Sequence, residues 1–95
     1  MEYKKIKIGK GCIEAIALPL GAKNLVLLRG ARGYIMCGYL NISAARKFKD
    51  VAVKITGVST VKEALSAHVH SRTPRAGGLG IYKGQPVKEV LKIIA

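Results

Sequence analysis

The sequence predicts an α+β domain with a mixed β-sheet, N-terminal antiparallel strands, two or three short helices and a C-terminal helix. Three observations support this prediction. Apolar or alternating segments fill residues 2–40, helical and strand patterns alternate over residues 42–72, and residues 86–95 carry an apolar stripe at helical spacing. The chain has 95 residues, with no repeat, linker or low-complexity tract, so we expect a single domain spanning 1–95.

The first part of the chain predicts four strands, at residues 2–8, 12–20, 25–30 and 34–40. The first alternates isoleucine with lysine, as in a half-exposed strand. The second contains Pro19, which indicates an edge because proline has no N–H to donate to a ladder. The third and fourth are apolar on both faces, which predicts that they are central in the sheet.

The rest of the chain predicts short helices between short strands. The expected strands are 51–57 and 68–72, and the expected helices are 42–49, 60–65, a short turn after 73 and 86–95. Asn41 or Ser43 is a candidate N-cap for the first helix. Thr60 and Glu63 fit a capping box for the second. Thr73 is a candidate cap before Pro74, and prolines at the first helical position open the last two helices.

The charge balance is the strongest feature of the composition. Seventeen Lys and Arg residues face five Asp and Glu residues, for a net charge of +12. Such an excess favours polyanionic partners, nucleic acid among them; the alternative is a strongly basic proteome or a solvated, self-repelling surface. The charge is spread along the chain. The first hairpin adds candidate phosphate contacts beside the aromatic ring of Tyr3, at Lys4, Lys5, Lys7 and Lys10.

The cysteines and the hydropathy pattern indicate a soluble cytoplasmic protein. Cys12 and Cys37 lack C-x-x-C spacing, so redox and zinc-ribbon motifs are excluded. The first residues lack the apolar core of a signal peptide, and no apolar stretch approaches the roughly 20 residues that span a bilayer. Glutamine and asparagine are scarce, a composition that fits a thermophile.

Cys37 is the candidate nucleophile. A catalytic thiol needs a nearby cation or helix N-terminus and a base, and the sequence offers a helix start at Asn41 and two histidines, His68 and His70. The alternative is a small buried hydrophobe. A position inside the fourth strand, away from a turn, favours the buried alternative.

Four further residues are candidates for ligand binding. Arg29 and Arg32 flank a glycine-rich turn whose amides can form an anion-binding nest, or which is a plain hairpin turn. Gly38, inside a predicted central strand, marks either a ligand approach or a tight packing spot. Asn41 lies at the carboxyl end of that strand, where it contacts a ligand or caps a helix.

The stretch KNLVLLRGARGYIMCGYLN, residues 23–41, resembles the signature of the YunC-like proteins, a small bacterial and archaeal family described as a domain of unknown function. The resemblance continues through residues 51–65 and 79–91 and covers most of the chain. It implies assembly into a homo-tetramer through N-terminal strands, here residues 1–40. It supplies no activity and no catalytic residue.

Three classes of function remain. We expect a homo-oligomeric module that binds a polyanion, either nucleic acid or a phosphorylated ligand. The alternatives are a small thiol-dependent enzyme using Cys37, and an assembly or accessory protein without a ligand of its own. The five acidic residues are isolated from one another, so no pair suits acid–base chemistry. We expect no cofactor, no metal site and no membrane partner, because two histidines alone do not complete a metal site.

Overall fold

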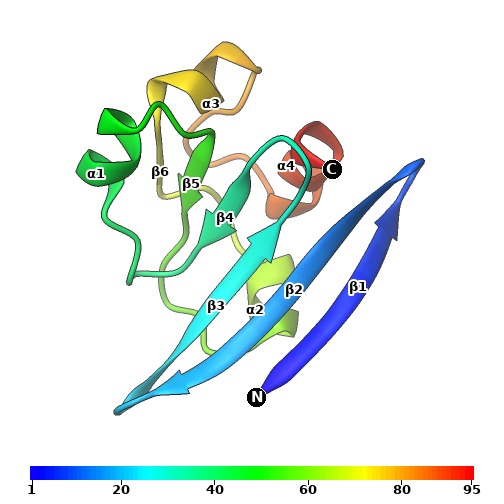
Figure 1. Ribbon diagram of the computed structural model, residues 1–95, viewed down its shortest axis with the longest axis vertical. Helices are drawn as coiled ribbons and strands as arrows, with labels where there is room; N and C mark the ends of the chain where they lie inside the picture. Colours follow the sequence, from blue (N-terminus) through cyan, green and yellow to red (C-terminus); the bar gives the residue numbers. More distant parts are fainter.

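One six-stranded mixed sheet runs through the computed structural model, which describes all 95 residues (Figure 1). The strands follow one another across the sheet in chain order: β1 (Glu2–Ile8), β2 (Gly11–Leu20), β3 (Lys23–Arg29), β4 (Tyr34–Met36), β5 (Ala52–Lys54) and β6 (Ser71–Arg72). Neighbouring strands are antiparallel except for β4 and β5, which are parallel. Helix α1 (Ile42–Lys47) connects this parallel pair.

Three helices share one face of the sheet with the main core. They are α2 (Val61–Leu65), α3 (Pro74–Gly78) and α4 (Val87–Ile94). Alternate residues of the strands point to this face and are fully buried, among them Ile13, Val26, Leu28, Ile35 and Val53. Helix α4 packs its apolar stripe onto them, as its sequence predicts.

The opposite face is covered only in part. Helix α1 packs there over β4 and β5 in a small second cluster around Leu40, Ala45 and Ala52. Over β1, β2 and β3 no helix lies on this side, and Figure 1 shows these strands in front of the rest of the molecule. We call this uncovered part the open face. Leu18 and Leu20, each 37% exposed, belong to it.

The structure confirms the α+β class, the mixed sheet and the C-terminal helix. Both strands that the sequence predicts to be central have neighbours on each side. Pro19 lies where β2 extends past the end of β1, because the β1–β2 pairing stops at Ala17. That end of β2 therefore has one neighbour only, as its proline predicts.

The fourth strand is shorter than predicted, because it ends at Met36 instead of residue 40. The Cys37 carbonyl turns out of the ladder and accepts the Leu40 N–H at 3.0 Å, which closes a turn over residues 37–40. The Cys37 thiol takes the position that the carbonyl leaves, since its Sγ accepts the Val26 N–H at 3.3 Å. The prediction that Cys37 lies in mid-strand is therefore wrong.

The helix starts confirm most of the predicted caps. The Asn41 side chain accepts the Ala44 N–H at 3.1 Å and caps α1. Thr60 caps α2 by accepting the Glu63 N–H. The Glu63 carboxylate, however, accepts the N–H of Ser59, one residue before the expected partner of a capping box.

Candidate functional site

A pocket of about 570 Å³ opens at the carboxyl ends of β4 and β5. Three short segments line it: the turn after β4, the loop after β5 and the start of β3. Its residues are Lys23, Asn24, Cys37, Gly38, Tyr39, Thr56, Gly57, Val58 and Ser59. We call it the loop pocket. The crevice outside the carboxyl ends of parallel strands is where open sheets bind ligands, and β4 and β5 are the parallel pair of this sheet.

Cys37 lies at the inner wall of the loop pocket and is 3% exposed. Its Sγ accepts the Val26 N–H and lies 3.8 Å from the Asn24 carbonyl oxygen. Both predicted bases, His68 and His70, are exposed, and neither is a hydrogen-bond partner of the thiol. The thiol therefore serves as a ladder partner in the sheet, and the geometry supplies no base for nucleophilic chemistry.

Gly38 does not mark a tight packing spot, so that alternative is wrong. It lies in the turn after β4 and lines the loop pocket. A Cβ atom added to it would meet no atom within 4 Å. The Tyr39 hydroxyl donates to the Leu20 carbonyl oxygen at 3.2 Å and ties this turn to the end of β2. Asn41 is not among the lining residues, because its side chain caps α1.

A second hollow, of about 410 Å³, lies between the β1–β2 turn, the β3–β4 turn and the end of α4. Its lining includes three cations, Lys10, Arg32 and Lys92, and no acidic side chain. We call it the basic hollow. The predicted candidates Lys10 and Arg32, far apart in the sequence, meet here, whereas Lys92 had no sequence signal beyond its charge.

The predicted anion nest at residues 29–33 has two of its amides already engaged. The Gly30 N–H donates to the Gly33 carbonyl at 2.8 Å, and the Arg32 N–H donates to the Ile94 carbonyl at 2.9 Å. A Cβ atom at Gly30 would lie 2.2 Å from the Ile94 oxygen. The glycine therefore permits close contact between this turn and the end of α4.

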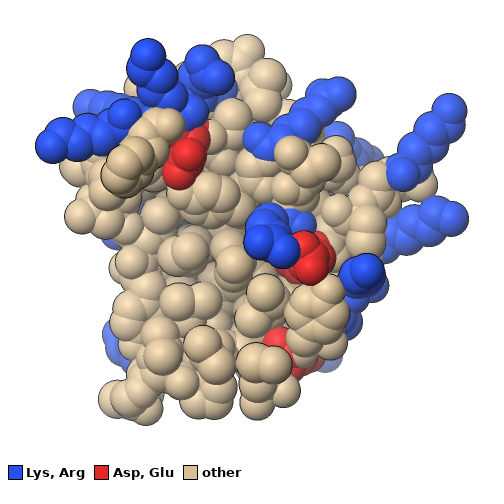
Figure 2. Space-filling view, in the orientation of Figure 1, with Lys and Arg blue, Asp and Glu red and all other residues tan.

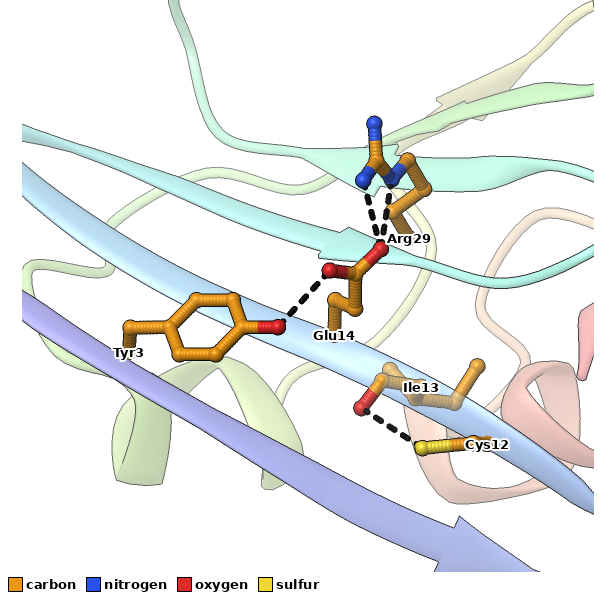
Figure 3. A network of polar contacts seen from close by, with 5 residues as sticks. All are labelled: Tyr3, Cys12, Ile13, Glu14 and Arg29. Atoms are coloured by element: carbon orange, nitrogen blue, oxygen red, sulfur yellow. Dashed lines mark hydrogen bonds and ion pairs between the residues drawn. The ribbon is translucent and has the colours of Figure 1, made fainter.

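Arg29 is held in a polar network on the open face (Figure 3). Its Nε lies 3.0 Å from Glu14 Oε1, and the Tyr3 hydroxyl donates to Glu14 Oε2 at 2.8 Å. The hydrogen bonds from Arg29 and then from Tyr3 hold the pKa of Glu14 below its ordinary value. The bond to Glu14 raises the pKa of Tyr3 and that of Arg29. Arg29 is thus the one cation with an acidic partner.

The four candidate lysines of the first hairpin do not share one face. The register places Lys5 opposite Glu14 and Lys7 opposite Cys12, so both point to the open-face side. Lys4, opposite the buried Ala15, points to the other side. Lys10 occupies the turn. All four are exposed, on or beside the edge strand of the sheet.

No group of three or more His, Cys, Asp or Glu side chains is placed to hold a metal ion. None of the helices has the length and apolarity needed to cross a bilayer.

Comparison with known proteins identifies the family. The model of a domain of unknown function, DUF1805, matches residues 36–94. The chain is also 35% identical over 81 residues to the uncharacterized protein YunC of Bacillus subtilis, an alignment covering 81% of this chain and 80% of YunC. The chain belongs to the DUF1805 family. The YunC-like resemblance of residues 23–41 is thereby confirmed.

The fold has a solved counterpart. The crystal structure of a protein of unknown function, TA1206 from Thermoplasma acidophilum, superposes with a TM-score of 0.94 at 33% sequence identity. The match covers 99% of this chain and 92% of TA1206. TA1206 therefore shares the fold described above over nearly the whole length of this chain.

Proposed function

We propose that this protein binds polyanions, with nucleic-acid phosphates as the expected ligand, through cations that several copies of the chain present together. One observation carries the proposal. Of the 17 Lys and Arg side chains, only Arg29 lies within salt-bridge distance of an acidic side chain. The remaining cations keep their charge free for a ligand.

The acidic side chains are few, and most are held by hydrogen bonds inside the protein. Hydrogen bonds inside the protein are accepted by Glu14, Asp50, Glu63 and Glu89. These carboxylates keep their charge, but five acidic groups do not offset 17 cations, so the net field still attracts phosphates.

The basic hollow is the centre of the proposed interface. Lys10, Arg32 and Lys92 line one concave surface without an acidic side chain, and such a concavity concentrates positive potential. Lys5 and Lys7 extend the cationic surface along the edge strand β1. Figure 2 shows many of the blue side chains gathered along the upper and right margins of the molecule.

The open face supports self-assembly. Figure 2 shows its lower left part, over the end of β2 and the start of β3, free of charged side chains, in a protein whose net charge is +12. Leu18 and Leu20 are exposed on it, and Leu27 is half-buried. A second copy is the proposed occupant of the part around Leu18 and Leu20, because covering that apolar part does not require the basic margins of two like-charged chains to meet. The expected assembly is the homo-tetramer that the YunC-like resemblance implies.

The binding test measures the affinity of a fluorescently labelled single-stranded oligonucleotide over a range of salt concentrations. The test variant carries Lys10→Met, Arg32→Met and Lys92→Met together. Each phosphate contact adds about 0.7 to the slope of log affinity against log salt for single strands, so the triple variant should lose a slope of about 2.

The matched control removes the same charge elsewhere, with Lys47→Met, Lys62→Met and Lys83→Met. It should keep most of the salt slope. If both triple variants lose affinity equally, the attraction is a general charge effect and the basic hollow is not its centre. If the wild-type protein binds neither oligonucleotide nor heparin at low salt, the function is that of an assembly protein without a polyanion ligand.

The assembly test is separate, and it uses sedimentation velocity. Leu18→Lys places a charge on the open face and should shift the protein toward monomer. Phe48→Lys is the control, because Phe48 is also apolar, is 77% exposed and lies at the end of α1. A wild-type protein that sediments as a monomer at all concentrations would remove self-assembly from the proposal.

A further inference from the structure

The loop pocket carries a set of unused hydrogen-bond donors. Five of the residues that line it have a backbone N–H group that donates to no acceptor in the protein: Gly38, Tyr39, Thr56, Gly57 and Val58. They come from two loops that the parallel pairing of β4 and β5 brings side by side. Backbone amides that converge from neighbouring turns form concave sites for anions.

The side chains of the loop pocket have the same donor character. The hydroxyls of Thr56 and Ser59 make no hydrogen bond in the protein, and Lys23 has no acidic partner. The Asn24 side chain donates to the Ser59 carbonyl at 3.0 Å and joins two of the three lining segments. No acidic side chain lines the pocket. The available chemistry is therefore one cation with several neutral donors, which suits a single negatively charged group.

The volume and the position of the loop pocket indicate a small molecule. About 570 Å³ lies within the range of roughly 300–1,000 Å³ typical of small-molecule sites. Tyr39 and Val58 supply apolar wall beside the donors. The glycine at 38 leaves open space where any side chain would protrude.

We propose that the loop pocket binds a small molecule that carries one oxyanion group, a phosphate or a carboxylate. The oxyanion accepts hydrogen bonds from the free amide N–H groups of the two loops and forms an ion pair with Lys23. The rest of the molecule lies against Tyr39 and Val58. This site shares no residue with the basic hollow, so it does not depend on polyanion binding.

The first test follows backbone amide shifts by NMR while inorganic phosphate, phenyl phosphate or benzoate is added at constant ionic strength. We expect saturable shifts at residues 38–39 and 56–58, with the aromatic probes binding more tightly than inorganic phosphate. Saturation by phenyl phosphate alone or by benzoate alone identifies the phosphate or the carboxylate as the group recognised. Shifts that stay linear with every probe, or that fall at residues 10 and 32 instead, overturn the proposal.

The second test uses variants that fill the pocket or remove its charge. Gly38→Ala should weaken binding of phenyl phosphate. Gly78→Ala is its matched control, because an added Cβ atom there also meets nothing within 4 Å and Gly78 lies outside the pocket, in α3. Lys23→Met should lose about tenfold in affinity, as expected for one hydrogen bond to a charged group, whereas Lys62→Met should not.

Equal affinities within either matched pair would contradict the proposed site. Thermal unfolding of each variant shows that a weaker affinity comes from the pocket and not from a damaged fold. Oligonucleotide binding should survive Gly38→Ala, so failure of the loop pocket and failure of the polyanion interface give different results.

Discussion

Replacing Thr73 with valine should destabilise the protein far more than replacing it with serine. The Thr73 side chain is fully buried, and its hydroxyl joins three parts of the chain. Its Oγ1 accepts the Ala52 N–H at 3.2 Å and the Ala76 N–H at 3.3 Å, and it donates to the Asp50 carbonyl at 2.6 Å. It thus anchors the start of β5 and caps α3 at the same time.

The expected cost of Thr73→Val is the sum of two losses. Losing the cap of α3 costs about 1 kcal/mol, and leaving the buried Ala52 N–H without an acceptor costs about 2 kcal/mol. Thr73→Ser keeps the hydroxyl and deletes one buried methyl group, for about 1 kcal/mol. In a domain of this size, 1 kcal/mol shifts Tm by about 4–8 °C, so valine should lower Tm by roughly 12–24 °C and serine by roughly 4–8 °C.

Scanning calorimetry and urea unfolding followed by circular dichroism measure both variants. The urea slope should stay constant, since neither change alters the surface exposed on unfolding. If the valine variant proves as stable as the serine variant, the hydroxyl does not hold β5 and α3 together, and the reasoning fails.

Three other outcomes are expected. Gly30→Ala places a Cβ atom 2.2 Å from a carbonyl oxygen of α4 and should cost about 1–3 kcal/mol in urea unfolding, whereas Gly78→Ala should stabilise by about 0.4–1 kcal/mol. Burial, and then a hydrogen bond to a carboxylate, raises the pKa of Tyr34 from 10.0 to about 12. Because the unfolded chain loses this proton first, the free energy of unfolding should fall as pH rises from about 10 to about 12. Tyr34→Phe should lack this pH-dependent fall in stability. In the native state Ellman's reagent should react rapidly with Cys12 alone, and equal rates for Cys37 would show that its thiol is accessible.

The local features of this fold were predictable because they depend on neighbours in the sequence. Asn41, Thr60 and Thr73 each accept an N–H three residues further along, and all three caps were visible as Asn or Thr before a helical pattern. The order of the strands, in contrast, could not be derived from the sequence, and the structure shows that consecutive strands pair with one another across the sheet.

The end of β4 was not predicted, because at this point a side-chain sulfur atom accepts the hydrogen bond that a backbone carbonyl would accept in a longer strand. The apolar pattern of residues 34–40 continues without a break, which predicts a longer strand. The Cys37 thiol replaces the residue's own carbonyl in the ladder, and no periodicity reports such an exchange. The glycine at 38, two residues after the true end of the strand, was the available turn signal.

The loop pocket could not be predicted from the sequence for a related reason. Its three segments start at Lys23, Cys37 and Thr56, and they meet only because β4 and β5 run parallel. Likewise, Gly30 was interpreted through its neighbouring arginines, whereas the atom that requires a glycine there belongs to Ile94, far along the chain. Contacts between distant segments need the topology before they can be inferred.

The close packing of the end of α4 and Ala95 against Gly30 and Gly11 has a consequence for biosynthesis. A ribosome delivers the N-terminal strands first and residues 87–94 after them, yet those late residues cover the apolar inner side of the early strands. A nascent chain of this protein therefore exposes the apolar side of an incomplete sheet until residues 87–94 have been synthesised. During that interval the nascent chain is most able to bind chaperones or to aggregate with other nascent copies of the same chain.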